Sequence, residues 1–264
     1  MNRFLMLCAV LLCVPTLPAQ IVAPPAAQQP ASKPATAQPQ TPEQQTQEQQ
    51  IQHMQAQLAD WPNLDRYRTE NAALPPVAAN EQRVVFYGDS ITDAWGRRAG
   101  TFFPGKPYVN RGISGQTTPQ MLVRFQQDVI HLHPAVVVIL AGTNDIAGNT
   151  GPSTPEMIED NFVSMAAIAK ENGIEMVIAS ILPAYAYPWK PGVQPAQEIR
   201  DVNRWLKDFC AQQELVYLDY YTKMADERGG MRPGLSSDGV HPTTQGYDLM
   251  APLAENAIAQ ALQK

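Results

Sequence analysis

The stretch VVFYGDS, residues 84–90, decides the fold of this chain. Four consecutive β-branched or aromatic residues that end at Gly88 are typical of a buried strand followed by a tight turn. Ser90 is therefore expected just beyond the carboxyl end of a strand and at the start of a helix. In open α/β sheets ligands bind at that edge, where the N–H groups of a helix start favour negative charge. Taken alone, Ser90 is either a nucleophile or an N-cap, because serine is also a favoured N-cap residue.

Beyond residue 90, short apolar runs alternate with helical patterns. The strongest run, AVVVIL at 135–140, is apolar on both faces, as a central parallel strand should be. Strands separated by helices predict a parallel sheet with right-handed crossovers. We therefore expect an α/β fold, a three-layer flavodoxin-like sandwich with helices on both faces of a five-stranded parallel sheet in the order 2-1-3-4-5. The expected strands are 84–87, 108–110, 135–140, 176–181 and 216–218, and the main helices are 118–130, 154–173, 197–212 and 244–262.

Three segments precede this domain. Residues 1–19 contain one base and then a mostly apolar stretch that is too short to cross a bilayer, which is typical of a secretory signal peptide. Residues 20–40 are rich in Pro, Ala and Gln and predict a disordered tether. We expect a helical N-terminal extension over 41–80 and the folded domain over 81–264. The protein is accordingly expected to be exported, to the periplasm or the extracellular space, without stable membrane insertion after signal cleavage.

Charge and cysteine content narrow the possible partners. The chain has 19 basic and 25 acidic residues and a formal net charge of −6, so electrostatics give it no reason to bind nucleic acid. Of its three cysteines only Cys210 lies beyond the signal segment, which excludes an internal disulfide in the mature chain. Cys210 is in helical phase with Val202, Leu206 and Phe209, and this spacing predicts a packed core thiol rather than a catalytic one.

Polar residues follow several of the expected strands at the same edge of the sheet. Gly115 follows the second strand, Asn144 follows the third, and Asp238 and His241 lie in a turn after the fifth. A serine hydroxyl is a weak nucleophile, so it needs a base, and the base needs an orienting acid. His241 can take the proton of Ser90 while Asp238 holds the imidazole. The N–H groups of Ser90 and Gly115 and the amide of Asn144 can supply the donors that a developing oxyanion requires.

These residues belong to four sequence blocks, which are GDSIT at 88–92, GISGQT at 112–117, GTND at 142–145 and DGVHP at 238–242. In this order the blocks resemble the SGNH hydrolases, also called GDSL esterases or lipases, and the wider text resembles bacterial acylhydrolases and carbohydrate deacetylases. The resemblance runs from about residue 83 to the C-terminus. It implies that Ser90 is the nucleophile, Gly115 and Asn144 are oxyanion donors, His241 is the base and Asp238 is its partner. No cofactor and no metal ion are implied.

Each block also has a simpler interpretation. Any one of them could be an ordinary turn, because Asx and Gly mark turns, and DGVHP could be half of a metal site. The remaining histidines lie elsewhere in the sequence, however, and Thr92 stands where a GxSxG elbow would have its second glycine, which argues against the α/β-hydrolase fold. After the fourth strand, Tyr187 and Trp189 lie in an aromatic, proline-rich loop. They either bind substrate by stacking on a sugar or an acyl chain, or they only pack the loop.

The sequence therefore predicts an exported serine esterase that hydrolyses small O-acyl esters through an acyl-enzyme. Acetyl groups on carbohydrate are favoured over long-chain lipids, because no long apolar lid or interfacial amphipathic helix is evident. A lysophospholipase or thioesterase that uses the same residues is the alternative. A non-catalytic glycan-binding module of the envelope is the third hypothesis, and a base poised on a hydroxyl argues against it.

Overall fold

The computed structural model describes residues 41–264, so the predicted signal peptide and tether lie outside the described residues. The chain divides into two compact units, residues 1–47 and 48–264. Of the first unit only residues 41–47 are described, and they include the beginning of helix α1 (Pro42–Ala59). Within residues 41–264, no helix combines the length and the apolar character that a membrane span requires. The second unit carries the sheet and the candidate site.

The sheet has five parallel strands in the order β2-β1-β3-β4-β5, which confirms the predicted fold class and strand order. Both β1 and β3 are buried along their whole length, as the all-apolar runs at 84–87 and 135–140 predicted. The second strand extends two residues further than expected, because Gly112 still pairs with Gly88 at the end of β1. The strands are β1 (Val84–Gly88), β2 (Tyr108–Gly112), β3 (Val136–Leu140), β4 (Glu175–Ala179) and β5 (Val216–Leu218).

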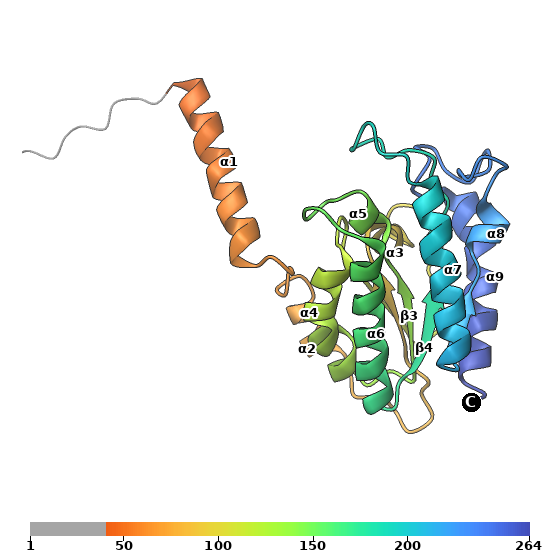
Figure 1. Ribbon diagram of the computed structural model, residues 1–264. Coiled ribbons are helices and arrows are strands. Elements are labelled where there is room, and N and C mark those ends of the chain that lie inside the picture. The colour runs from red at the N-terminus through yellow and green to blue at the C-terminus, as the bar shows by residue number, and fades with distance from the viewer. Residues whose placement is uncertain (1–40) are drawn as a thin grey trace, which may run out of the picture. The chain divides into compact units, whose positions relative to one another are not determined.

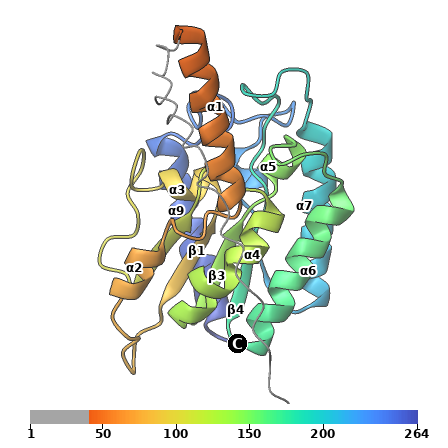
Figure 2. The same ribbon diagram turned by 90° about the vertical axis from the view of Figure 1, so that its left-hand side faces the viewer.

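Alternate residues of β1 point to opposite faces of the sheet and begin two separate cores. Val85 and Tyr87 pack against α4, α6 and α7, whereas Val84 and Phe86 pack against α9 and the residues around α3. Figures 1 and 2 show these two helical layers with the sheet between them.

Cys210 is buried in the first core, and its burial raises the pKa of the thiol to about 12, which agrees with the predicted core thiol. The helices are α2 (Arg68–Ala73), α3 (Ser90–Ala94), α4 (Thr118–Asp128), α5 (Thr143–Ile146), α6 (Pro155–Glu171), α7 (Ala196–Gln212), α8 (Tyr221–Met224) and α9 (Thr244–Ala261), with a short 3₁₀ helix at Ile130–Leu132.

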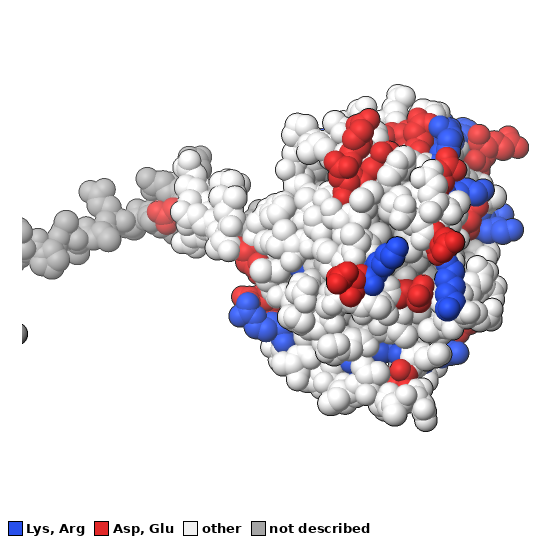
Figure 3. Space-filling model, turned by 60° about the horizontal axis from the view of Figure 1, so that its bottom comes forward, with Lys and Arg blue, Asp and Glu red and all other residues white. Residues whose placement is uncertain are grey.

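Charged side chains are mixed over the surface that Figure 3 shows. Acidic and basic groups alternate on the sheet-forming unit, and acidic ones gather toward the top of that view. Binding to nucleic acid relies on clustered Lys and Arg. The mixture on this face is in keeping with the net negative charge of the sequence.

Residues 60–74, which fall within the predicted N-terminal extension, pack against the sheet-forming domain. Tyr67 is fully buried, and its hydroxyl donates a hydrogen bond to the carbonyl oxygen of Gly112 at the end of β2. Gln127 on α4 donates to the carbonyl oxygen of Leu64 at 2.6 Å. These contacts make the segment a structural part of the domain, although its sequence has no strong helical or strand pattern.

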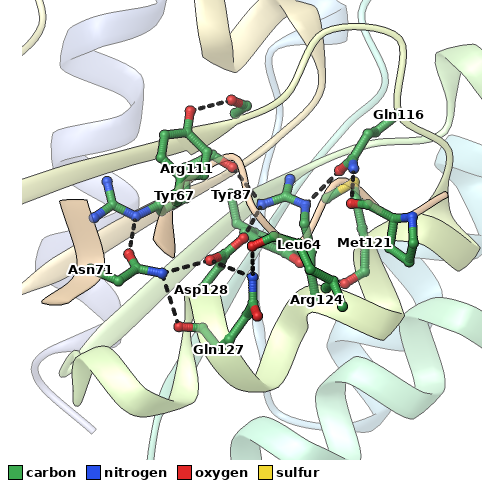
Figure 4. A network of polar contacts seen from close by, with 12 residues as sticks. Leu64, Tyr67, Asn71, Tyr87, Arg111, Gln116, Met121, Arg124, Gln127 and Asp128 are labelled. Carbon is green, nitrogen blue, oxygen red and sulfur yellow. Dashed lines mark hydrogen bonds and ion pairs between the residues drawn. The ribbon is translucent and has the colours of Figure 1, made fainter. Parts of the chain in front are cut away.

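A fully buried arginine, Arg124 on α4, joins the ends of two strands (Figure 4). Its guanidinium donates to the carbonyl oxygen of Gly88 at 3.0 Å and to that of Arg111 at 2.9 Å. It also pairs with the buried carboxylate of Asp128 at 3.2 Å, and its Nε donates to the side-chain oxygen of Gln116. Because Gly88 precedes the candidate nucleophile and Gln116 follows Gly115, this network fixes two segments of the candidate site.

Candidate active site

Ser90 is the first residue of α3, directly after β1. The N-cap of that helix is Asp89, whose Oδ1 accepts a hydrogen bond from the backbone N–H of Ile91 at 2.9 Å. The helix therefore does not use the Ser90 hydroxyl as its cap, which removes the simpler interpretation of this serine. The turn is tight enough that a Cβ on Gly88 would lie 2.2 Å from Oγ1 of Thr92, so only glycine fits there.

The three predicted triad residues meet at the carboxyl edge of the sheet. Oγ of Ser90 lies 2.9 Å from Nε2 of His241, and Nδ1 of His241 lies 2.7 Å from Oδ2 of Asp238. The other carboxylate oxygen, Oδ1, accepts from the backbone N–H groups of His241 at 2.8 Å and Val240 at 2.9 Å. Partial loss of hydration raises the pKa of Asp238, but these hydrogen bonds outweigh it and lower the pKa to about 2. An ionised Asp238 therefore holds a proton on Nδ1 and leaves Nε2 free to accept one from Ser90.

Ser90, Gly115 and Asn144 are the residues that the sequence predicted as oxyanion donors. Among residues 41–264, the backbone N–H groups of Ser90 and Gly115 donate to no other protein group. Gly115 has a φ of +81° with open space around its Cα, so its backbone conformation, rather than crowding, requires glycine. Asn144 is buried on α5 and donates through Nδ2 to the carbonyl oxygen of Gln116 at 3.0 Å. The same Nδ2 also donates to Oδ2 of Asp89 at 3.4 Å, so the amide has two protein acceptors.

The comparisons with known proteins follow the same part of the chain. The family model of the GDSL-like lipase/acylhydrolase family matches residues 86–249, which include every residue of the arrangement above. The chain belongs to this family. The match confirms the SGNH hydrolase family that the four sequence blocks predicted, and it supports hydrolysis of esters as the class of reaction.

This SGNH hydrolase is similar to several bacterial proteins. A GDSL-like lipase from Bacteroides thetaiotaomicron VPI-5482 is 44% identical, with a TM-score of 0.73 over 76% of this chain and 98% of that one. Esterase TesA of Pseudomonas aeruginosa is 30% identical over 51% of this chain and 60% of its own length. N-acylneuraminate cytidylyltransferase of Streptococcus agalactiae serotype V is 27% identical over 64% of this chain. The chain spans only 41% of that cytidylyltransferase, so the match covers one part of a longer protein.

The two predicted binding residues in the aromatic loop of this SGNH hydrolase differ in exposure and therefore in role. Tyr187 is only 2% exposed, and its hydroxyl is 2.9 Å from that of Thr143. A ring so buried offers a substrate no surface, which differs from the binding role that we predicted for it. Trp189 is 41% exposed, stacks on Tyr187 with ring centroids 5.0 Å apart, and lies 6.1 Å from the His241 ring. Tyr187 therefore supports Trp189, and Trp189 is the residue that faces the site.

Two buried carboxyl groups lie behind the site of this hydrolase. Burial raises the pKa of Asp89 to about 7, even though the backbone N–H of Ile91 opposes the shift. Burial likewise raises the pKa of Asp145 to about 6 against the hydrogen bonds from Thr118. Asp145 accepts from the Thr118 N–H at 3.0 Å and from its hydroxyl at 2.6 Å. It thereby joins α5 to the first turn of α4 and has a structural role.

Sequence reasoning missed Asn149, which contacts both Asn144 and Gly115. Its Nδ2 donates to Oδ1 of Asn144 at 2.8 Å and to the carbonyl oxygen of Gly115 at 3.3 Å. Its Oδ1 accepts from the indole N–H of Trp189 at 3.0 Å. The only signal in the sequence is its position five residues after Asn144 in a Gly-Asn turn, and that pattern is common to many loops.

Proposed function

We propose that this SGNH hydrolase is a serine esterase that cleaves small O-acyl esters, with acetyl groups on carbohydrate as its favoured substrates. The observation that carries the proposal is the continuous hydrogen-bonded chain from Ser90 through His241 to Asp238. Its order matches what a weak nucleophile needs, which is a base in contact with the hydroxyl and an acid in contact with the base. The N-terminal segment 1–19 supports export as part of the same proposal.

The proposed reaction has two balanced halves. In acylation, Oγ of Ser90 attacks the ester carbonyl carbon while Nε2 of His241 takes the hydroxyl proton, and the carbonyl oxygen becomes an oxyanion beside Gly115 and Asn144. The intermediate collapses, the alcohol leaves with the proton from His241, and the acyl group stays on Ser90. In deacylation, a water molecule gives its proton to His241 and attacks the acyl carbon. Collapse then releases the carboxylic acid and returns the proton to Ser90.

The surroundings of the serine support an alcohol part that is larger than the acyl part. Trp189 presents an exposed ring beside His241, and indole rings are suited to stacking on the apolar face of a sugar. A groove of about 860 Å³ is lined by Gly115, Asn149 and Trp61, among other residues. The apolar side chains that line this groove, Met54, Leu58, Trp61 and Ile113, favour the alternative, a lysophospholipase or thioesterase with an acyl chain in the groove.

Two experiments test the proposal. Ser90→Ala should retain the fold and lower kcat by about 10⁴-fold or more, as expected when a nucleophile of this kind is removed. Ser164→Ala is the matched control, because its hydroxyl only bonds the Asp160 carbonyl oxygen on the surface of α6. A serine-directed phosphonate should label Ser90 alone. An Ala variant that keeps most of its turnover, or a label on another residue, would exclude this nucleophile.

The substrate class is decided by comparing p-nitrophenyl esters of increasing chain length with acetylated oligosaccharides. The proposal expects kcat/KM to fall as the acyl chain lengthens and to be highest for the acetylated oligosaccharides. A maximum at eight or more acyl carbons would instead favour the lysophospholipase or thioesterase alternative.

A further inference from the structure

The indole of Trp189 sets the orientation of a side-chain amide next to the site. An indole N–H can only donate a hydrogen bond. Because it donates to Asn149 at 3.0 Å, the amide oxygen of Asn149 must face Trp189. The NH₂ group of Asn149 must then point the other way, toward Oδ1 of Asn144 at 2.8 Å and the carbonyl oxygen of Gly115 at 3.3 Å.

The same polarity continues into the oxyanion hole. Oδ1 of Asn144 accepts from Asn149, so the NH₂ group of Asn144 faces the opposite side, where the carbonyl oxygen of Gln116 accepts from it at 3.0 Å. A backbone carbonyl can only accept, as the indole can only donate. With a donor-only group at one end and an acceptor-only group at the other, both amides have a single orientation that satisfies every bond. That orientation turns the NH₂ group toward the carbonyl oxygen of Gln116 and, at 3.4 Å, toward Oδ2 of Asp89. The proposed mechanism requires the developing oxyanion to replace one of these two acceptors.

We propose that Asn149 is a positioning residue that holds the Asn144 amide in its oxyanion-binding orientation, and that Trp189 acts on Asn144 through Asn149. The inference rests on the proposed esterase mechanism and adds a second role for Trp189. Its ring faces the substrate while its N–H fixes the polarity of the oxyanion hole. Asn149 does not touch the reacting atoms, so its effect must appear through Asn144.

Four variants test the hydrogen-bonded path from Trp189 through Asn149 to Asn144. The substrate is p-nitrophenyl acetate, which is too small to need a sugar-stacking surface. Asn149→Ala removes the only one of the three groups around the Asn144 amide that donates to its oxygen, and leaves the acceptors Gln116 and Asp89 in place. We expect kcat to fall about tenfold with KM within a few-fold. Asn149→Asp offers only acceptors and draws the NH₂ of Asn144 toward itself, so kcat should fall further, toward the 10²-fold or so of a lost oxyanion donor. Trp189→Phe keeps an aromatic ring but removes the N–H, and it should also lower kcat. In the Asn149→Ala background, Trp189→Phe should change kcat by less than about twofold, because two residues that act through one path are not additive.

Controls separate this proposal from simple loss of structure and from failure of the esterase mechanism. Asn149 is exposed, so its variants should keep the wild-type melting temperature. Asn172→Asp makes the same chemical change at an exposed amide at the end of α6 and should leave kcat unchanged. Asn144→Ala is measured alongside.

The outcomes distinguish failure of the positioning role from failure of the esterase mechanism. If Asn144→Ala lowers kcat but the Asn149 variants do not, or if the effects of Trp189→Phe and Asn149→Ala simply add, the positioning role is wrong while the esterase mechanism stands. If Asn144→Ala itself leaves kcat unchanged, then Asn144 is not an oxyanion donor. The positioning role of Asn149 then fails as well, because Asn149 is proposed to act only through Asn144.

Discussion

The buried ion pair of Arg124 and Asp128 allows a stability prediction that can be worked from the contacts in Figure 4. Arg124→Met removes the guanidinium and leaves the Asp128 carboxylate fully buried, with Asn71 as its nearest remaining donor at 2.7 Å. The carbonyl oxygen of Gly88 keeps a second donor, the backbone N–H of Ile113 at 3.0 Å, so it is not left unsatisfied. The buried side-chain oxygen of Gln116 loses Nε of Arg124 as its donor, but the carboxylate that loses its counter-ion carries the larger cost. Removing one partner of a buried ion pair costs about 3–5 kcal/mol.

Urea unfolding followed by circular dichroism measures this loss as a decrease in the free energy of unfolding. Small domains have a total stability of about 5–15 kcal/mol, so the single variant should fold only marginally. The double variant Arg124→Met/Asp128→Leu removes both charges and should recover at least half of the loss, because apolar replacement of a whole buried pair is often nearly neutral. A loss below about 1.5 kcal/mol for Arg124→Met, or a double variant less stable than the single one, would refute the reasoning that the unpaired charge carries the cost.

Two further predictions concern the site and its pH dependence. Asn144→Ala should lower kcat by about 10²–10³-fold while KM stays within a few-fold, because its amide acts on the transition state. A large fall in melting temperature with a normal kcat for the folded fraction would make Asn144 a turn residue instead. Since burial raises the pKa of Asp89 from 3.8 to about 7, the folded chain binds that proton more tightly than the unfolded chain, and this stabilisation is lost as pH rises through about 7. Between pH 4 and 7 this proton makes the free energy of unfolding fall by up to about 1.4 kcal/mol per pH unit, and Asp89→Asn should abolish that part of the slope. A slope that is the same in Asp89→Asn would contradict the raised pKa of Asp89.

The fold could be predicted because its determinants are local. The all-apolar runs that became β1 and β3 can be buried on both faces only inside a parallel sheet, and the intervening helical periodicity fixes where each crossover lies. The site could be predicted because Ser90, Asn144 and His241 each lie in a short block whose turn chemistry is visible in the sequence. Parallel strands bring such turns to one edge, so the meeting of these three residues could be expected before any distance was known.

What the sequence could not reveal depends on tertiary contacts. Arg124 and Asp128 stand four residues apart on α4, a spacing that usually marks a solvent-exposed ion pair, yet both are fully buried. Tyr187 and Trp189 are two residues apart in one loop and only the structure shows that the first is buried beneath the second. Asn149 occupies a Gly-Asn turn like many others, and its importance comes from the donor and acceptor groups that happen to meet it.

Gln116 explains why the folded domain begins well before residue 81. Its main-chain oxygen accepts from Asn144, its side-chain oxygen accepts from Arg124, and its Nε2 donates to the carbonyl oxygen of Pro62 at 2.6 Å. Gln116 is 2% exposed, so removing the segment around Pro62 would leave a buried amide N–H without its acceptor, at a cost of about 1–3 kcal/mol. The main-chain oxygen of the same residue accepts from Asn144. The segment before the first strand therefore supports the loop that carries Gln116 and, through that loop, the main-chain acceptor of the Asn144 amide.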